Sequence, residues 1–124
     1  MVDDDQSIRE ATARLLRSSG FQIETFSSAE AFLDSPHLRE TRCLILDIRM
    51  PGMSGLELQR RLDATGLHIP IVFVSAHGSE ALRKEAMQAG AIDLLSKPCS
   101  GEALLQAIRS ALESATRARP VGCS

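Results

Sequence analysis

The most informative hydrophobic run is the unbroken apolar segment 43–46, which stops at an acid, Asp47. A run of this length without a polar interruption is typical of a strand buried on both faces, as in a parallel sheet covered by helices. Pro51, Gly52 and Ser54 follow, and these residues predict a turn and then a helix start. In open α/β sheets, binding and catalytic residues usually lie at the carboxyl ends of such strands. An aspartate at this position can also serve only to form the turn after the strand.

Four other segments have the patterns of strands. Residues 21–26 alternate apolar and polar side chains, which predicts a strand with one less buried face. Segments 69–75 and 91–96 are mainly apolar and predict two further strands. Only residues 1–2 precede the acids that begin at Asp3, so the first strand is expected to be cut short.

Five segments repeat apolar residues at helical spacing. They are residues 6–19, 27–33, 54–64, 79–89 and 100–115. Asp5 is placed to cap the first helix. Ser27 and Ser54 each precede a glutamate by three residues, the spacing of a capping box, so they are expected to begin the second and third helices. The apolar stripe of the fourth helix is thin, and this helix is expected to pack weakly.

Strand and helix therefore alternate five times, which predicts parallel strands joined by right-handed crossovers in one α/β domain. The domain is expected to span residues 1–116. Residues 117–124 contain Pro120 and Gly122 and show no hydrophobic period. They are interpreted as a tail or the start of a linker.

Composition excludes several classes of function. The chain has 124 residues, of which 44% are hydrophobic and 24% charged, an ordinary balance for a soluble globular domain. Lys and Arg number 14 against 16 Asp and Glu, so the net charge of −2 gives no attraction to nucleic acid. No segment has the character of a membrane span or a signal peptide, and the expected compartment is the cytoplasm. The 3 cysteines are far apart and predict neither a zinc site nor a disulfide framework.

Polar side chains follow the predicted strands at equivalent positions. They are Asp3 and Asp4 after the first strand, Asp47 after the third, Ser75 after the fourth and Lys97 after the fifth. Because the carboxyl ends of parallel strands share one edge of the sheet, these side chains are expected to meet there. Each also has an ordinary structural interpretation: the acids as a helix cap, the serine as a turn residue and the lysine as a surface charge.

Carboxylates that lie close together raise one another's pKa unless a cation sits among them. Oxygen ligands in a small open site suit Mg²⁺, which keeps several waters and accepts a phosphate oxygen. Lys97 offers a compact positive charge for a phosphoryl group, and Ser75 offers a hydroxyl donor. Asp47 stands alone on the central strand, so we expect it to be a nucleophile that forms an acyl phosphate. Asp3 and Asp4 would then form the metal side.

The motifs at residues 2–5, 46–55, 75–76 and 89–98 have a specific combined pattern. Together they resemble the receiver domain of bacterial two-component response regulators, and the resemblance covers residues 2–112. The amino-acid sequences of three short stretches, residues 49–55, 76–78 and 85–87, are most similar to those of the nitrogen-fixation regulator subfamily. Members of that subfamily usually carry a LuxR-type helix-turn-helix domain after the receiver.

The resemblance implies a flavodoxin-like (βα)5 doubly wound parallel sheet in the order 2-1-3-4-5, here with a truncated first strand. It implies that Asp47 accepts a phosphoryl group from a sensor histidine kinase. Mg²⁺ would be bound by Asp4, Asp47 and the backbone carbonyl of Arg49. Asp3 would act on the metal mostly through water.

The same resemblance implies that Ser75 and Lys97 hold the phosphoryl oxygens, and that the bond between Lys97 and Pro98 is cis. Three features depart from the family. Leu94 stands where active receivers usually have Tyr or Phe, a ring that turns inward during switching. Cys99 stands where the family often has Phe, which predicts looser packing. The short first strand predicts that the chain lacks a few native residues or that its start was misplaced.

The leading interpretation is a signalling phosphoacceptor and not an enzyme, with at most its own phosphotransfer and autodephosphorylation. Phosphorylation would change the face of the fourth helix, fifth strand and fifth helix, and with it dimerisation. DNA would be contacted only through an output domain absent from this chain, and an isolated domain of a longer regulator is expected.

Two alternatives are open. An aspartate-based phosphatase usually has a second acid two residues after the nucleophile, but that position holds Arg49. A degenerate receiver acting as a phosphorylation-independent interaction module is favoured somewhat by Leu94, Cys99 and the short first strand.

Overall fold

The computed structural model describes residues 1–76, 80–97 and 100–118, with side chains up to residue 113 in the last helix. The elements are α1 (Gln6–Ser18), α2 (Ala29–Leu33), a 3-10 helix η1 (Leu38–Glu40), β1 (Leu44–Asp47), α3 (Gly55–Ala64), β2 (Ile71–Ser75), α4 (Glu80–Gln88), β3 (Asp93–Ser96) and α5 (Gly101–Ala118). Strands and helices alternate from β1 onward, as predicted. Within the described ranges, no helix combines the length and apolarity needed to cross a membrane.

The sheet is parallel and has the predicted strand order. β1, β2 and β3 pair in that order, with Leu46 opposite Phe73 and Phe73 opposite Leu94. Val2 lies beyond β1 and forms isolated parallel bridges to both Leu46 and Phe26. Across the sheet the backbone therefore runs in the order of the second, first, third, fourth and fifth segments, which confirms the order 2-1-3-4-5.

The prediction of a regular strand at residues 21–26 is wrong, because only Phe26 forms a bridge to the rest of the sheet. The Phe26 N–H donates to the Met1 carbonyl at 2.8 Å, and the Asp3 N–H donates to the Phe26 carbonyl at 3.1 Å. The Glu24 carbonyl also accepts the amino group of Met1, at 2.8 Å, but residues 21–25 form no bridge to another described strand. The first strand is correspondingly reduced to the single bridging residue Val2.

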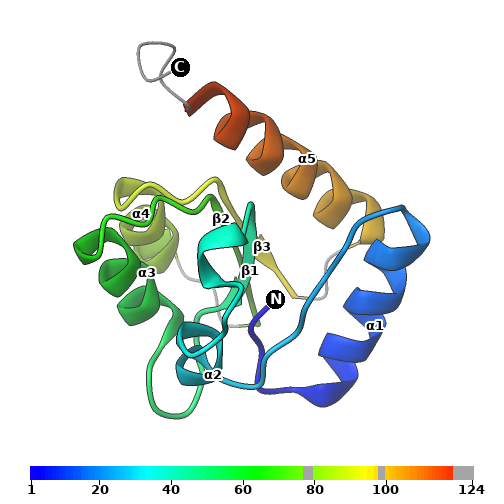
Figure 1. The fold of residues 1–124 in the computed structure, drawn as a ribbon, viewed down its shortest axis with the longest axis horizontal. Coiled ribbons are helices and arrows are strands. Elements are labelled where there is room, and N and C mark those ends of the chain that lie inside the picture. Colours follow the sequence, from blue (N-terminus) through cyan, green and yellow to red (C-terminus); the bar gives the residue numbers. More distant parts are fainter. Residues whose placement is uncertain (77–79, 98–99, 119–124) are drawn as a thin grey trace.

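Helices lie on both sides of the sheet (Figure 1), and the buried core is divided between these two sides. Successive strand residues point to opposite faces, which divides the apolar side chains between the layers. One layer joins Leu44, Leu46 and Phe73 of the sheet to Phe32 of α2, Leu58 and Leu62 of α3, and Ala86 of α4. The other joins Ile45 and Val74 to Leu16 of α1 and to Leu104 and Ile108 of α5. α1 and α5 thus cover one face, and α2, α3 and α4 cover the other.

Two helix starts follow the predicted caps. Asp5 accepts hydrogen bonds from the N–H groups of Ser7 and Ile8 at the start of α1, at 2.9 and 3.3 Å. Ser54 accepts from the N–H of Glu57 at the start of α3, at 3.2 Å. Both side-chain oxygens satisfy amides that have no partner inside their own helix.

Three helix details differ from the predictions. The second helix begins at Ala29, with Ser28 and not Ser27 as its cap, because Ser28 has the extended backbone from which its hydroxyl reaches Ala31. α5 continues to Ala118, past the predicted end near residue 115, through residues of good helix propensity. α4 contributes only Ala86 to the buried core, which agrees with the predicted thin stripe.

Gly55 allows α3 to start directly against the end of β1. A Cβ at Gly55 would collide with the carbonyl oxygen of Asp47, and it would lie 3.1 Å from the Cα of Ile48 and from Phe73. The Asp47 and Ile48 atoms belong to the backbone, so they cannot rotate away.

We therefore expect Gly55→Ala to lower the free energy of unfolding by about 1–3 kcal/mol in urea denaturation. Gly101→Ala is the matched control, since its added Cβ would meet only the flexible side chain of Leu15, at 3.2 Å. Equal stability of the two variants would contradict this account of the β1–α3 junction.

The amino group of Met1 is buried and donates to the carbonyl of Glu24 at 2.8 Å. Burial lowers its pKa to about 6, against the smaller opposing effects of Cys43 and Glu24. The usual pKa of an α-amino group is about 8, so between pH 6 and 8 the unfolded chain binds a proton that the folded chain does not. Stability from this group therefore rises with pH through that window.

The expected gain in the free energy of unfolding between pH 5.5 and 8.5 is about 2 kcal/mol, measured by urea denaturation at both pH values. A chain with an acetylated amino terminus is the control, because it has no amine to titrate. If both proteins show the same pH dependence, the amino group does not titrate as its burial requires.

Candidate functional site

Three acids from two segments meet at the carboxyl edge of the sheet. Asp47 is the last residue of β1, and the bridge of Val2 to Leu46 places Asp3 and Asp4 beside it. Carboxylate oxygens of Asp3, Asp4 and Asp47 lie within 4.8 Å of one another. Asp3 and Asp47 are buried, whereas Asp4 is exposed, so the cluster opens to solvent on one side.

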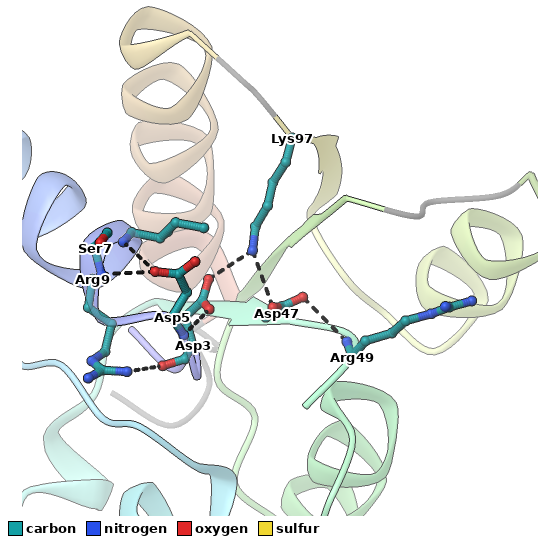
Figure 2. A network of polar contacts seen from close by, with 8 residues as sticks. Asp3, Asp5, Ser7, Arg9, Asp47, Arg49 and Lys97 are labelled. Carbon is teal, nitrogen blue, oxygen red and sulfur yellow. Dashed lines mark hydrogen bonds and ion pairs between the residues drawn. The ribbon is translucent and has the colours of Figure 1, made fainter. Parts of the chain in front are cut away.

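Lys97 reaches this cluster from the end of β3 (Figure 2). Its Nζ atom lies 3.0 Å from Oδ2 of Asp3 and 3.2 Å from Oδ2 of Asp47. The side chain is only 16% exposed, so both ion pairs are largely shielded from water. The amine therefore points toward the acids and not away from them.

Ser75 ends β2 at the same edge. Its neighbour Val74 lies opposite Asp47 in the sheet register, and Ser75 itself lies opposite Ser96. Ser75 is 1% exposed, and its carbonyl accepts the N–H of Lys97 at 2.9 Å. This backbone bond fixes the start of the lysine side chain beside the serine.

The electrostatics of the cluster reflect its burial. Burial raises the pKa of Asp47, and the charge of Asp3 raises it further, while Lys97 acts in the opposite direction. Burial acts to lower the pKa of Lys97, but its hydrogen bond to Asp3 and the charges of both carboxylates outweigh burial and raise it. The lysine is therefore held as a cation, and it offsets part of the repulsion between the two buried acids.

Backbone contacts fix the acidic loop. The N–H of Asp5 donates to Oδ1 of Asp3 at 2.9 Å, and Nη1 of Arg9 donates to the Asp3 carbonyl at 2.7 Å. On the other side, the N–H of Arg49 donates to Oδ1 of Asp47 at 3.3 Å. Each buried carboxylate thus has one oxygen held by a backbone amide and the other directed at Lys97 (Figure 2).

The supporting roles of two residues, Arg9 and Glu30, were not predicted from the sequence. Arg9 lies one turn into α1, and its only signal is a basic residue close behind the acids. Glu30 of α2 accepts the N–H of Met53 at 3.1 Å, which attaches α2 to the loop after Asp47. No local pattern predicts a contact across 23 residues.

Leu94 is buried on β3 opposite Phe73, and its carbonyl accepts Nη1 of Arg83 at 3.0 Å. An aliphatic side chain therefore fills the position where the family usually has an aromatic ring. The expected cis bond to Pro98 and the expected looser packing at Cys99 lie outside the described residues.

The donor set suits a hard divalent cation. Three carboxylates supply only oxygen atoms, and the exposure of Asp4 leaves room for the waters that Mg²⁺ retains. Two of the acids are buried and only partly compensated by Lys97, so additional positive charge would be favourable there. The residues present therefore fit Mg²⁺.

Comparison with known proteins agrees with this arrangement. Residues 1–109 match the response regulator receiver domain. The chain is 47% identical over 119 residues to the response regulator protein TodT of Pseudomonas putida, which covers 96% of this chain and 52% of TodT. It is 43% identical over 112 residues to the transcriptional regulatory protein FixJ of Azorhizobium caulinodans, which covers 90% of this chain and 53% of FixJ.

A solved structure, that of the response regulator StyR, superposes with a TM-score of 0.87 at 50% identity and covers 95% of this chain and 60% of StyR. The chain spans about half the length of the curated relatives it matches. The family match covers most of the chain, and the FixJ-like resemblance seen in its motifs is confirmed. The chain belongs to the response regulator receiver domain family.

Proposed function

We propose that the chain is the phosphoacceptor of a two-component system, and that Asp47 receives a phosphoryl group from a sensor histidine kinase in the presence of Mg²⁺. The observation that carries the proposal is the convergence of Asp3, Asp4 and Asp47 with the ammonium of Lys97. A nucleophilic carboxylate, a cation site and a phosphate-binding amine are the groups that phosphoryl transfer to an aspartate requires.

In this proposal the metal would be bound by Asp4, Asp47 and the backbone carbonyl of Arg49. Asp3 would act on it mostly through water. When bound, Mg²⁺ supplies positive charge that neutralises the phosphoryl oxygens. The acids would fix the position of the cation, and the amide of Arg49 keeps Asp47 oriented. The phosphodonor would enter from the side of Asp4, because Asp4 is the exposed member of the acid cluster.

Transfer uses few groups of the chain. A carboxylate oxygen of Asp47 attacks the phosphorus of a phosphohistidine, and the bond from phosphorus to the imidazole nitrogen breaks. Its electron pair stays on that nitrogen. Lys97 exchanges its contact with the Asp47 carboxylate for one with a phosphoryl oxygen, and the hydroxyl of Ser75 donates to another. Catalysis is then mainly positioning and charge neutralisation.

The output of the switch is proposed from the family. The phosphorylated state would change the face formed by α4, β3 and α5, and with it dimerisation. DNA would be contacted through an output domain outside this chain, because the relative FixJ is named a transcriptional regulatory protein and this chain matches only 53% of its length. Such a regulator would act in the cytoplasm, with no turnover beyond its own phosphotransfer and autodephosphorylation.

A second candidate is an interaction module that works without phosphorylation. Leu94 favours it, because an aliphatic side chain at this position lacks the ring that family members rotate. The buried acids and Lys97 favour the phosphoacceptor, since an interaction module has no need of a shielded ion pair at the sheet edge. Magnesium binding separates the two candidates.

Incubation with acetyl phosphate and Mg²⁺ should add the mass of one phosphoryl group to the intact protein, as measured by mass spectrometry. Asp47→Asn should abolish the gain, because an amide does not act as the nucleophile. Asp63→Asn, which changes an exposed acid of α3, should leave the gain unchanged. A gain that persists in Asp47→Asn would contradict the assignment.

Titration with Mg²⁺ tests the metal site, and calorimetry suits it because the chain has no Trp or Tyr. Asp4→Asn should weaken binding on the order of tenfold, since one carboxylate ligand is lost. Asp5→Asn is the matched control and should leave magnesium binding unchanged, because Asp5 lies outside the acid cluster. Asn also caps helices, so the start of α1 should be kept. Absence of magnesium binding by the unmodified chain would support the interaction module instead.

A further inference from the structure

The loop between β1 and α3, residues 48–54, carries two groups that the proposed magnesium site uses. The carbonyl of Arg49 is a proposed ligand of the metal, and the N–H of Arg49 donates to Oδ1 of Asp47 at 3.3 Å. Figure 2 shows the Arg49 backbone beside the Asp47 carboxylate. The conformation of this loop therefore decides where one ligand lies and how the phosphoacceptor is oriented.

The backbone of the loop turns sharply between its two fixed ends. The ends are joined by the N–H of Gly55, which donates to the carbonyl of Ile48 at 2.9 Å. Between them Gly52 has a φ of +79°, a left-handed conformation that glycine adopts without steric cost. Glycine also adopts many other conformations, so the shape of the turn depends on contacts with the rest of the molecule.

Glu30 of α2 supplies a polar contact to the middle of the loop. Its Oε1 atom accepts the N–H of Met53 at 3.1 Å, across 23 residues of sequence. The same oxygen lies 3.1 Å from the position that a Cβ of Gly52 would occupy, so it lies against the turn itself. The side chains of Met50 and Met53 are buried as well, but a flexible methionine side chain restrains the backbone less than a hydrogen bond to its amide does.

The carboxylate of Glu30 is held in place for this contact. Hydrogen bonds from its own N–H and from the N–H of Met53 lower its pKa, and the smaller effect of burial opposes them. The group is therefore ionised, and such a charge-assisted hydrogen bond is stronger than one between neutral groups. Its helix is anchored in the core by Ala29 and Phe32, which are 0% and 2% exposed. α2 thus presents the carboxylate to the loop from a fixed position.

We propose that Glu30 is a positioning residue for the magnesium site, which fixes the Met53 amide and thereby keeps the Arg49 carbonyl and the Asp47 carboxylate in place for the metal. Glu30 lies outside the acid cluster and would touch neither the metal nor the phosphoryl group. The inference rests on the proposed function, because it concerns the same site. Residues that orient metal ligands commonly change metal affinity by about tenfold or more when they are replaced.

Three substitutions of Glu30 separate its reach from its charge. Glu30→Gln keeps an oxygen at the same reach but has no charge. Glu30→Asp keeps the charge but is one methylene shorter and should not reach Met53, and Glu30→Ala has neither property. In calorimetric titration with Mg²⁺, Glu30→Gln should stay within about threefold of the unmodified chain, whereas Glu30→Asp and Glu30→Ala should bind about tenfold more weakly. Glu113→Asp, the same change at an exposed position of α5, should leave the affinity unchanged.

Hydrogen exchange of the chain without metal gives a measurement that does not depend on magnesium. The amide of Met53 should exchange about tenfold faster in Glu30→Asp than in the unmodified chain, because its acceptor is lost. The amide of Arg49 should also exchange faster, since it belongs to the loop that is released. Both amides should stay protected in Glu30→Gln. A role of Glu30 in the stability of α2 alone would change neither the exchange of Arg49 nor the affinity for magnesium.

The outcomes separate this inference from the proposed function. If the unmodified chain binds no magnesium, the proposed function fails and this inference fails with it. If the chain binds magnesium and Glu30→Asp binds it equally well, or if Met53 exchanges at the same rate in both, only this inference is overturned. Equal weakening by Glu30→Gln and Glu30→Asp would also overturn it, because the position of the oxygen would then have no effect. If Glu30→Ala does not fold, the comparison of Glu30→Asp with Glu30→Gln decides.

Discussion

The ammonium of Lys97 lies between two buried carboxylates, and this contact joins segments that are up to 94 residues apart in sequence. Without a cation, Asp3 and Asp47 would be two like charges brought together in a poorly solvated place, which is strongly unfavourable. The lysine therefore holds the ends of the first, third and fifth segments of the sheet together. In the proposed function the same oxygens would bind the metal ion or the phosphoryl group, so stability and chemistry would depend on one set of atoms.

Backbone geometry positions the groups of this cluster. Asp3 is held by an amide of its own loop and by Arg9, and Asp47 is held by the amide of Arg49. Behind Asp47, Gly55 lets α3 approach the strand end so closely that any larger residue would collide with it. A site fixed in this way depends little on side-chain rearrangement, which agrees with chemistry that is mostly positioning.

The sequence predicts this fold well where a pattern is long and repeated, and poorly where the outcome depends on a distant partner. The apolar run before Asp47 and the helical period of α5 are local signals, and both elements form. The alternation of residues 21–26 predicts a regular strand, but only Phe26 forms a bridge, because strand pairing depends on a distant segment and not on the local pattern. The cap of α2 falls on Ser28 instead of Ser27, since the choice is made by backbone angles that no spacing rule contains.

The candidate site likewise has residues whose positions the sequence predicts and residues whose roles depend on distant contacts. The positions of Asp47, Ser75 and Lys97 at strand ends follow from the alternation of elements, and the structure brings Asp47 and Lys97 into contact. The roles of Arg9 and Glu30 arise only from the folded geometry, because each acts through a backbone group of another segment. Val2 makes both bridges of the sheet's first segment, and Asp3 is the next residue along the chain. A displacement of Val2 would consequently be transmitted through one peptide unit to Asp3, whose carboxylate contacts Lys97.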